Sequence, residues 1–175
     1  MSTTSVPAAH LPPLGVRARG EVGMELQATL IELIDLALVG KQLHWSVVGP
    51  LFRPLHLQLD ELIDAWRELG DAVAERAIAI GYWPDGQADA VVAGGERQRL
   101  ERGPMQDQAV LQELVRRLAE AGGRSRTRMD RLGDLDAASQ DVLTDVVREL
   151  ETQLWMLRAQ LPQQGAAPLG GNVAT

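Results

Sequence analysis

Two histidines and three carboxylates lie close together in the second quarter of this 175-residue sequence. Imidazole and carboxylate groups are the ligands that proteins use for iron, manganese and zinc. Cysteine is absent, which excludes disulfides and thiolate metal sites. The five metal-ligating candidates are His44, His56, Asp60, Asp71 and Glu75.

The spacing of these residues predicts a site that one chain cannot complete alone. If residues 54–80 form one helix, the last four candidates project within about 100° of one another. His56 and Glu75 are nevertheless about 28 Å apart along the helix axis. The stripe therefore holds two half-sites, one His/Asp and one Asp/Glu, with centres about 22 Å apart.

A second copy of the helix would complete both half-sites. With a twofold axis near Ala65 and Trp66, the His/Asp half of one chain faces the Asp/Glu half of the other. His44 lies opposite His56 across the turn expected at Gly49-Pro50 and adds a third ligand to the first half. Each shared site would then have two imidazoles and three carboxylates, enough for one tightly held iron and a second, weaker one.

Each candidate also has a simpler reading. A single histidine on a helix is more often a core or surface residue than a ligand. Asp71 and Glu75 are spaced as an ordinary solvated acidic pair, with Arg67 and Arg76 as ion-pair partners. The Glu-x-x-His motif of single-chain di-iron bundles is missing, which counts against a site within one chain. Five ligand-type residues in complementary halves favour the shared metal site.

Composition restricts the class of protein further. The net charge of −7, with a single lysine, argues against a general nucleic-acid surface. No apolar stretch is long enough to span a membrane. The N-terminus lacks the pattern of a secretory signal, so we expect a cytoplasmic protein, with the nucleoid as the alternative location.

Apolar residues at helical spacing predict an all-α fold. Four long helices with one long middle connection are typical of an up-down-down-up, ferritin-like four-helix bundle, here with a short helix in the connection. Ser139 is the expected N-cap of the last helix. We predict no β structure. The expected domains are a disordered N-terminal tail (1–20), the bundle (21–162) and a flexible C-terminal tail (163–175). The expected helices cover residues 22–47, 54–80, 87–93, 104–132 and 140–161.

The segment from Lys41 to Arg76 resembles the Dps family of mini-ferritins (DNA-binding proteins from starved cells). The resemblance rests on the pattern K-x-x-H-W-x-V-x-G-x-x-F-x-x-L-H-x-x-x-D-x-L followed by D-x-x-A-E-R. Residues 139–141 and 153–158 also resemble the last helix of that family. The resemblance covers residues 22–161.

The resemblance implies a ferroxidase and iron store. Members form a hollow dodecamer, oxidise Fe(II), commonly with hydrogen peroxide, at twofold interfaces, and keep ferric mineral inside. By position, His44, His56 and Asp60 of one chain would meet Asp71 and Glu75 of its partner around two irons. The alternative is a DNA-compacting stress protein with secondary iron chemistry, although this sequence lacks the Lys-rich tails that often bind DNA in the family.

The positions of four further residues in the sequence suggest functional roles for them. Trp45, next to the first histidine, is a candidate electron donor, or alternatively a core aromatic residue that locks the hairpin. The start of the last helix lines a cation pore in the family, which makes Asp141 the best pore candidate and Asp136 and Asp145 weaker ones. For Asp141 the alternative is a favourable interaction with the helix dipole.

Overall fold

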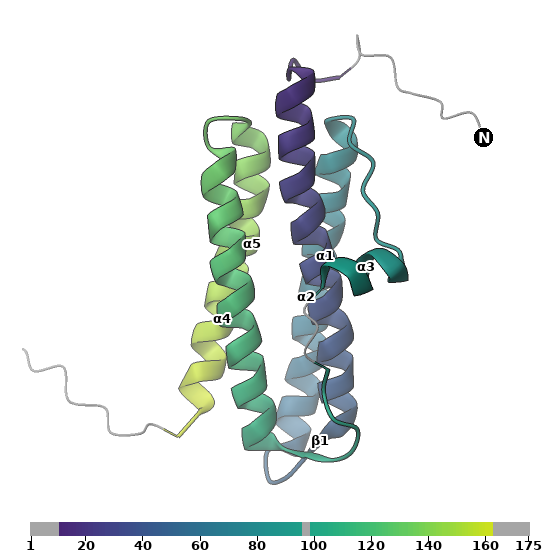
Figure 1. Cartoon of the computed structure of the whole chain (residues 1–175). Helices are drawn as coiled ribbons and strands as arrows, with labels where there is room; N and C mark the ends of the chain where they lie inside the picture. The colour runs from purple at the N-terminus through teal and green to yellow at the C-terminus, as the bar shows by residue number, and fades with distance from the viewer. Residues whose placement is uncertain (1–10, 96–98, 163–175) are drawn as a thin grey trace, which may run out of the picture.

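The computed structural model describes residues 11–95 and 99–162 and confirms an all-α four-helix bundle. Its long helices are α1 (Val16–Ser46), α2 (Phe52–Ala79), α4 (Asp107–Leu132) and α5 (Ala137–Gln160). The short helix α3 (Ala88–Gly94) lies in the middle connection, as predicted. In Figure 1, α1 and α2 form one hairpin and α4 and α5 the other, with α3 beside the middle of α1.

The connection between α2 and α4 runs along the length of the bundle (Figure 1). It makes α2 and α4 parallel, which gives the predicted up-down-down-up order. Its end forms a strand, β2 (Met105–Gln106), which pairs in parallel with β1 (Val47–Val48) after α1. The prediction of no β structure was therefore wrong by two short strands. Two-residue strands that pair across more than fifty residues leave no period for sequence analysis to detect.

The core is a continuous apolar cluster to which all four long helices contribute one face. Trp66 of α2 lies at its centre, fully buried, and donates a hydrogen bond from Nε1 to Gln153 Oε1 of α5 at 2.7 Å. A side chain at Gly40 of α1 would collide with Trp66 and Ile63, so glycine permits the close approach of α1 and α2 there. The hairpin that holds the predicted ligands is thus tightly packed.

Helix α1 starts earlier than predicted. Residues 16–20, assigned to a disordered tail, are helical, while residues 1–10 and the C-terminal tail at 163–175 lie outside the described residues. The ion pair of Arg17 with Glu21, at 2.8 Å, supports this first turn, and Leu14 packs on the core just before it. None of the described helices combines the length and the apolar character that crossing a membrane requires.

Candidate iron-binding half-sites

His44 and His56 form a reciprocal pair where α1 meets α2. The Nδ1 atom of His44 lies 3.0 Å from the carbonyl oxygen of His56, and the Nδ1 atom of His56 lies 3.0 Å from the carbonyl oxygen of His44. The two imidazole rings stack with centroids 3.6 Å apart. The centroid of the Phe52 ring lies 5.1 Å from that of His56. His44 is 7 % exposed, whereas His56 is only partly buried.

This pairing determines the tautomer of both rings. A carbonyl oxygen can only accept, so each Nδ1 must carry the proton and donate it. The Nε2 atom of each neutral ring then keeps its lone pair, which is the form that binds a metal ion. Metal-binding histidines are commonly oriented in this way by a hydrogen bond from the other ring nitrogen. The geometry of the pair is therefore compatible with metal binding through the two Nε2 atoms.

Asp60 lies one turn after His56 and contacts the same pair. Its Oδ1 atom is 3.4 Å from Nδ1 of His44 and accepts a hydrogen bond from Nζ of Lys41 at 2.5 Å. The Lys41 ammonium holds the pKa of Asp60 below its ordinary value, with a smaller contribution from the two histidines. Asp60 is thus a carboxylate whose ionised form is favoured by the cation beside it. Lys41 was not singled out from the sequence, although it precedes His44 by one helical turn.

Asp71 and Glu75 lie further along α2, exposed to solvent. Among the described residues, neither makes a hydrogen bond or an ion pair. The arginines proposed as their partners are engaged elsewhere: Arg67 pairs with Asp64 at 3.4 Å, and Arg76 with Asp136 at 2.6 Å. The predicted ion pairs with these arginines are therefore wrong, whereas the exposure of both carboxylates agrees with the alternative of a solvated acidic pair.

A single chain does not complete a metal site within its described part, residues 11–95 and 99–162. No group of three or more His, Cys, Asp or Glu side chains is placed there to hold a metal ion. His44, His56 and Asp60 are neighbours, while Asp71 and Glu75 remain apart from them on the same helix. This is the arrangement that two half-sites require of an isolated subunit.

Trp45 is 71 % exposed, so its alternative role as a core aromatic residue is wrong for this chain. It lines an apolar groove of about 680 Å³ between α1 and α2, together with Lys41, Asp71 and Leu38. Leu38 is also exposed, at 61 %. One face of the hairpin thus exposes apolar surface beside the candidate ligand Asp71.

The three candidate pore residues have different environments. Asp141 and Asp145 are exposed on α5, and Asp145 pairs with Arg148 at 3.1 Å. Asp136 is the N-cap of α5: it accepts from the backbone N–H of Ser139 at 3.2 Å and from Arg76 of α2. The prediction that Ser139 is the N-cap was therefore wrong: Ser139 is the third residue of the helix.

The pKa of Asp136 is lowered. Burial opposes this shift, but the hydrogen bonds from Ser139 and the charge of Arg76 outweigh it. Arg76 directly follows Glu75, so the Asp136 contact joins the acidic half-site to the start of α5. Neither this contact nor the role of Arg76 was anticipated from the sequence.

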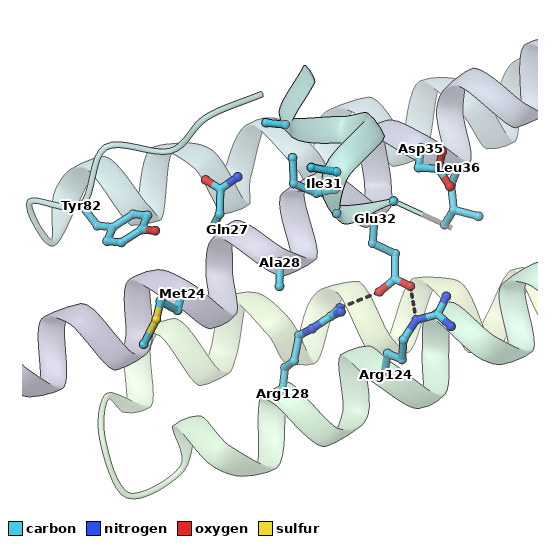
Figure 2. Close-up of a pocket in the computed structure, with 14 residues that line it drawn as sticks. Met24, Gln27, Ala28, Ile31, Glu32, Asp35, Leu36, Tyr82, Arg124 and Arg128 are labelled. Atoms are coloured by element: carbon cyan, nitrogen blue, oxygen red, sulfur yellow. Dashed lines mark hydrogen bonds and ion pairs between the residues drawn. The ribbon is translucent and has the colours of Figure 1, made fainter. Parts of the chain in front are cut away.

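A second cavity, of about 540 Å³, lies between α1, α3 and α4. Figure 2 shows Glu32 there with its carboxylate between Arg124 and Arg128, each bonded to it at 2.5 Å. Because both arginines are held by Glu32, the cluster ties α1 to α4 and offers no site of its own.

Comparison with known proteins identifies the family to which the chain belongs. The family model of the ferritin-like domain matches residues 24–164. A protein of Mycolicibacterium smegmatis named DNA protection during starvation protein is 32 % identical over 89 % of this chain and 85 % of its own length. DNA protection during starvation protein 2 of Deinococcus radiodurans is 30 % identical over 94 % of this chain and 68 % of its own.

A solved structure leads to the same family. Mycobacterium smegmatis Dps in a tetragonal crystal form has a TM-score of 0.84 and 31 % identity, covering 95 % of this chain and 98 % of that one. With a matching domain over most of its length and relatives of this identity and coverage, the chain belongs to the Dps family of ferritin-like proteins.

Proposed function

We propose that this protein is a ferroxidase and iron store that oxidises Fe(II) with hydrogen peroxide at sites shared between two subunits. The observation that carries the proposal is the division of ligands on α2. A prepared imidazole pair with Asp60 lies at one end, and an acidic pair without partners among the described residues lies about 22 Å away.

Dimerisation through the groove between α1 and α2 would bring complementary halves together. The groove exposes Leu38 and Trp45 and reaches Asp71, so a second copy that covers the apolar surface also approaches the acidic half-site. A twofold axis that crosses α2 at the level of Ala65 and Trp66 creates two equivalent sites, because each chain gives what the other lacks.

The donor set suits iron as the substrate. Carboxylates are hard ligands that favour Fe(III) as the charge increases, and imidazoles suit Fe(II). In the reaction, two Fe(II) ions each give one electron to one hydrogen peroxide, its O–O bond breaks, and two protons are taken up. The products are two Fe(III) ions and two water molecules, so no hydroxyl radical is released. We propose that the ferric product is stored inside a dodecamer, which at 19.0 kDa per chain has a mass of about 228 kDa.

Two further roles belong to this proposal. Exposed Trp45, beside His44, is a candidate electron donor to the site. Asp141 is the best candidate for a cation pore, because it is exposed near the start of α5, whereas Asp136 is already bound by Arg76. The names of the relatives refer to DNA protection, but with a net charge of −7 we do not propose direct DNA binding for this chain.

The test is the double substitution His44→Gly with His56→Gly. We expect it to remove nearly all peroxide-driven oxidation of Fe(II), followed by the absorbance of the ferric product, while size-exclusion chromatography still shows the assembled shell. Wild-type protein should consume about two Fe(II) per hydrogen peroxide. A double variant that oxidises iron at the wild-type rate would refute the proposal.

A further inference from the structure

Asp107, the first residue of α4, is a buried carboxylate that the proposed chemistry does not use. It is 4 % exposed. Its Oδ2 atom accepts a hydrogen bond from the backbone N–H of Leu51 at 2.7 Å, and its Oδ1 atom accepts one from the N–H of Gln108 at 2.8 Å. A buried charge is costly unless it is hydrogen-bonded, and here both oxygens have donors.

The contact with Leu51 attaches the turn between α1 and α2 to the start of α4. Gly49 in this turn has φ +126°, and a Cβ there would lie 2.6 Å from Oδ2 of Asp107. Glycine is thus required both by the backbone conformation and by the approach of the carboxylate. Next to it, Val47 and Val48 pair with Met105 and Gln106 in the parallel β1–β2 ladder. The turn is therefore held in place by Asp107 of α4 and by Met105 and Gln106, the two residues directly before α4.

The same turn connects the helix end that carries His44 to the helix start that carries His56. His44 is near the end of α1 and His56 is in the second turn of α2. Their reciprocal Nδ1–carbonyl bonds, both 3.0 Å, require the two helix ends to keep one relative position. Hydrogen bonds weaken steeply when distance or angle departs from the preferred range. A small displacement of the turn would therefore weaken both bonds at once.

We propose that Asp107 is a positioning residue of the histidine half-site. It does not contact iron; it fixes the turn that holds each histidine against the other's carbonyl group. In this way it maintains the Nδ1–H tautomers and leaves both Nε2 atoms free for the metal. This inference rests on the proposed ferroxidase function, which gives the free Nε2 atoms their purpose.

The experiment compares three variants in the assembled, full-length protein. Asp107→Ala removes both acceptors. Asp107→Asn is isosteric and keeps one oxygen that can accept from Leu51, so it should hold the turn and keep the wild-type tautomers. Val110→Ala is the matched control, because Val110 is also buried on the first turns of α4, and its truncation destabilises that helix while leaving every hydrogen bond of Asp107 in place.

The direct readout is the tautomer of the imidazoles in the iron-free protein. The chain has three histidines, and a His10→Gln background leaves His44 and His56 as the only labelled rings for solid-state ¹⁵N NMR. We expect both rings to be protonated at Nδ1 in wild type and in Val110→Ala. In Asp107→Ala we expect mixed tautomers, together with about a tenfold increase in the Fe(II) concentration that gives half-maximal oxidation.

The outcomes separate the two proposals. If Asp107→Ala keeps wild-type tautomers, or if Val110→Ala shows the same changes, Asp107 has no positioning role. If Asp107→Ala does not assemble, the same comparison is made with Asp107→Ser, whose hydroxyl is too short to reach Leu51 but can still accept from an N–H at the start of α4, and wild-type tautomers there overturn the inference. If wild type itself does not oxidise Fe(II), the proposed function fails, while the NMR comparison still decides what Asp107 does.

Discussion

Ligands that are prepared before the metal binds reduce the ordering required at the moment of binding. Under the proposed function His44 and His56 are such ligands, because each donates its Nδ1 proton to the other's backbone carbonyl group. Asp60 is prepared differently: Lys41 keeps it ionised but also occupies one of its oxygens. The lysine would therefore both support the proposed ligand and compete with the metal for it.

Removing the competing cation should strengthen metal binding. In Lys41→Met, Asp60 remains ionised at neutral pH because even its ordinary pKa is about 3.9. We therefore expect the Fe(II) concentration for half-saturation to fall about two- to fivefold, the effect of losing one exposed ion pair. Anaerobic Fe(II) titration measures this. Lys41→Arg, which keeps the cation, should bind Fe(II) as the wild type does. If Lys41→Met and wild type reach half-saturation at the same Fe(II) concentration, Lys41 does not have this role.

The elements were largely predictable because their signal is local. Apolar residues repeat at helical spacing along all four long helices, and the turn at Gly49-Pro50 ends the first of them. Contacts distant in sequence were not predictable. Lys41 reaches Asp60 across 19 residues, Leu51 reaches Asp107 across 56, and Arg76 reaches Asp136 across 60.

The cap of α5 illustrates the difference. Asp136 and Ser139 are both good N-cap residues, and the sequence alone favoured the second. Arg76 of α2 stabilises the Asp136 carboxylate from outside the helix, and the helix begins one residue later, at Ala137. Because the choice of N-cap depends on a side chain from another helix, the local sequence around α5 could not predict it.

The charge of Asp136 should make stability depend on pH. Its folded-state pKa is lowered, so the ionised group stabilises the fold above its unfolded pKa of about 3.9. This contribution is lost as pH falls through the folded-state pKa. We expect Asp136→Asn, which keeps a cap but loses the charge, to lower the free energy of unfolding by about 1.5 kcal/mol at pH 7.

Urea denaturation at fixed protein concentration tests this expectation. The difference between wild type and Asp136→Asn should shrink below pH 4, while Asp134→Asn, an exposed acid in the preceding loop, should stay within about 0.5 kcal/mol of wild type throughout. A difference that is independent of pH would contradict the assigned role of the charge.

At the scale of the whole molecule, one subunit is incomplete in two respects. The groove between α1 and α2 exposes apolar side chains, and under the proposed function each half-site lacks the ligands of the other. Both are satisfied if a second copy covers that face. The division of the candidate ligands into two groups was predictable from their spacing along α2. The groove was not predictable from the sequence, because the exposure of its side chains depends on how the helices pack against one another.

A charge in the groove should therefore block assembly and chemistry together. In Leu38→Asp we expect a mass far below 228 kDa by size-exclusion chromatography with light scattering, retained helical circular dichroism, and little Fe(II) oxidation. Val16→Asp is the control, since Val16 is 85 % exposed at the start of α1, outside the groove. Normal assembly of Leu38→Asp would rule out the groove as the interface.

Complementation between two inactive variants tests the shared site most directly. One variant carries His44→Gly with His56→Gly, the other Asp71→Ala with Glu75→Ala, and the two are unfolded, mixed equally and refolded. In every mixed dimer one site receives both intact halves, so random pairing predicts about a quarter of wild-type oxidation. No recovery above either variant alone, in mixtures that native mass spectrometry shows to contain mixed dimers, would contradict a site built by two chains.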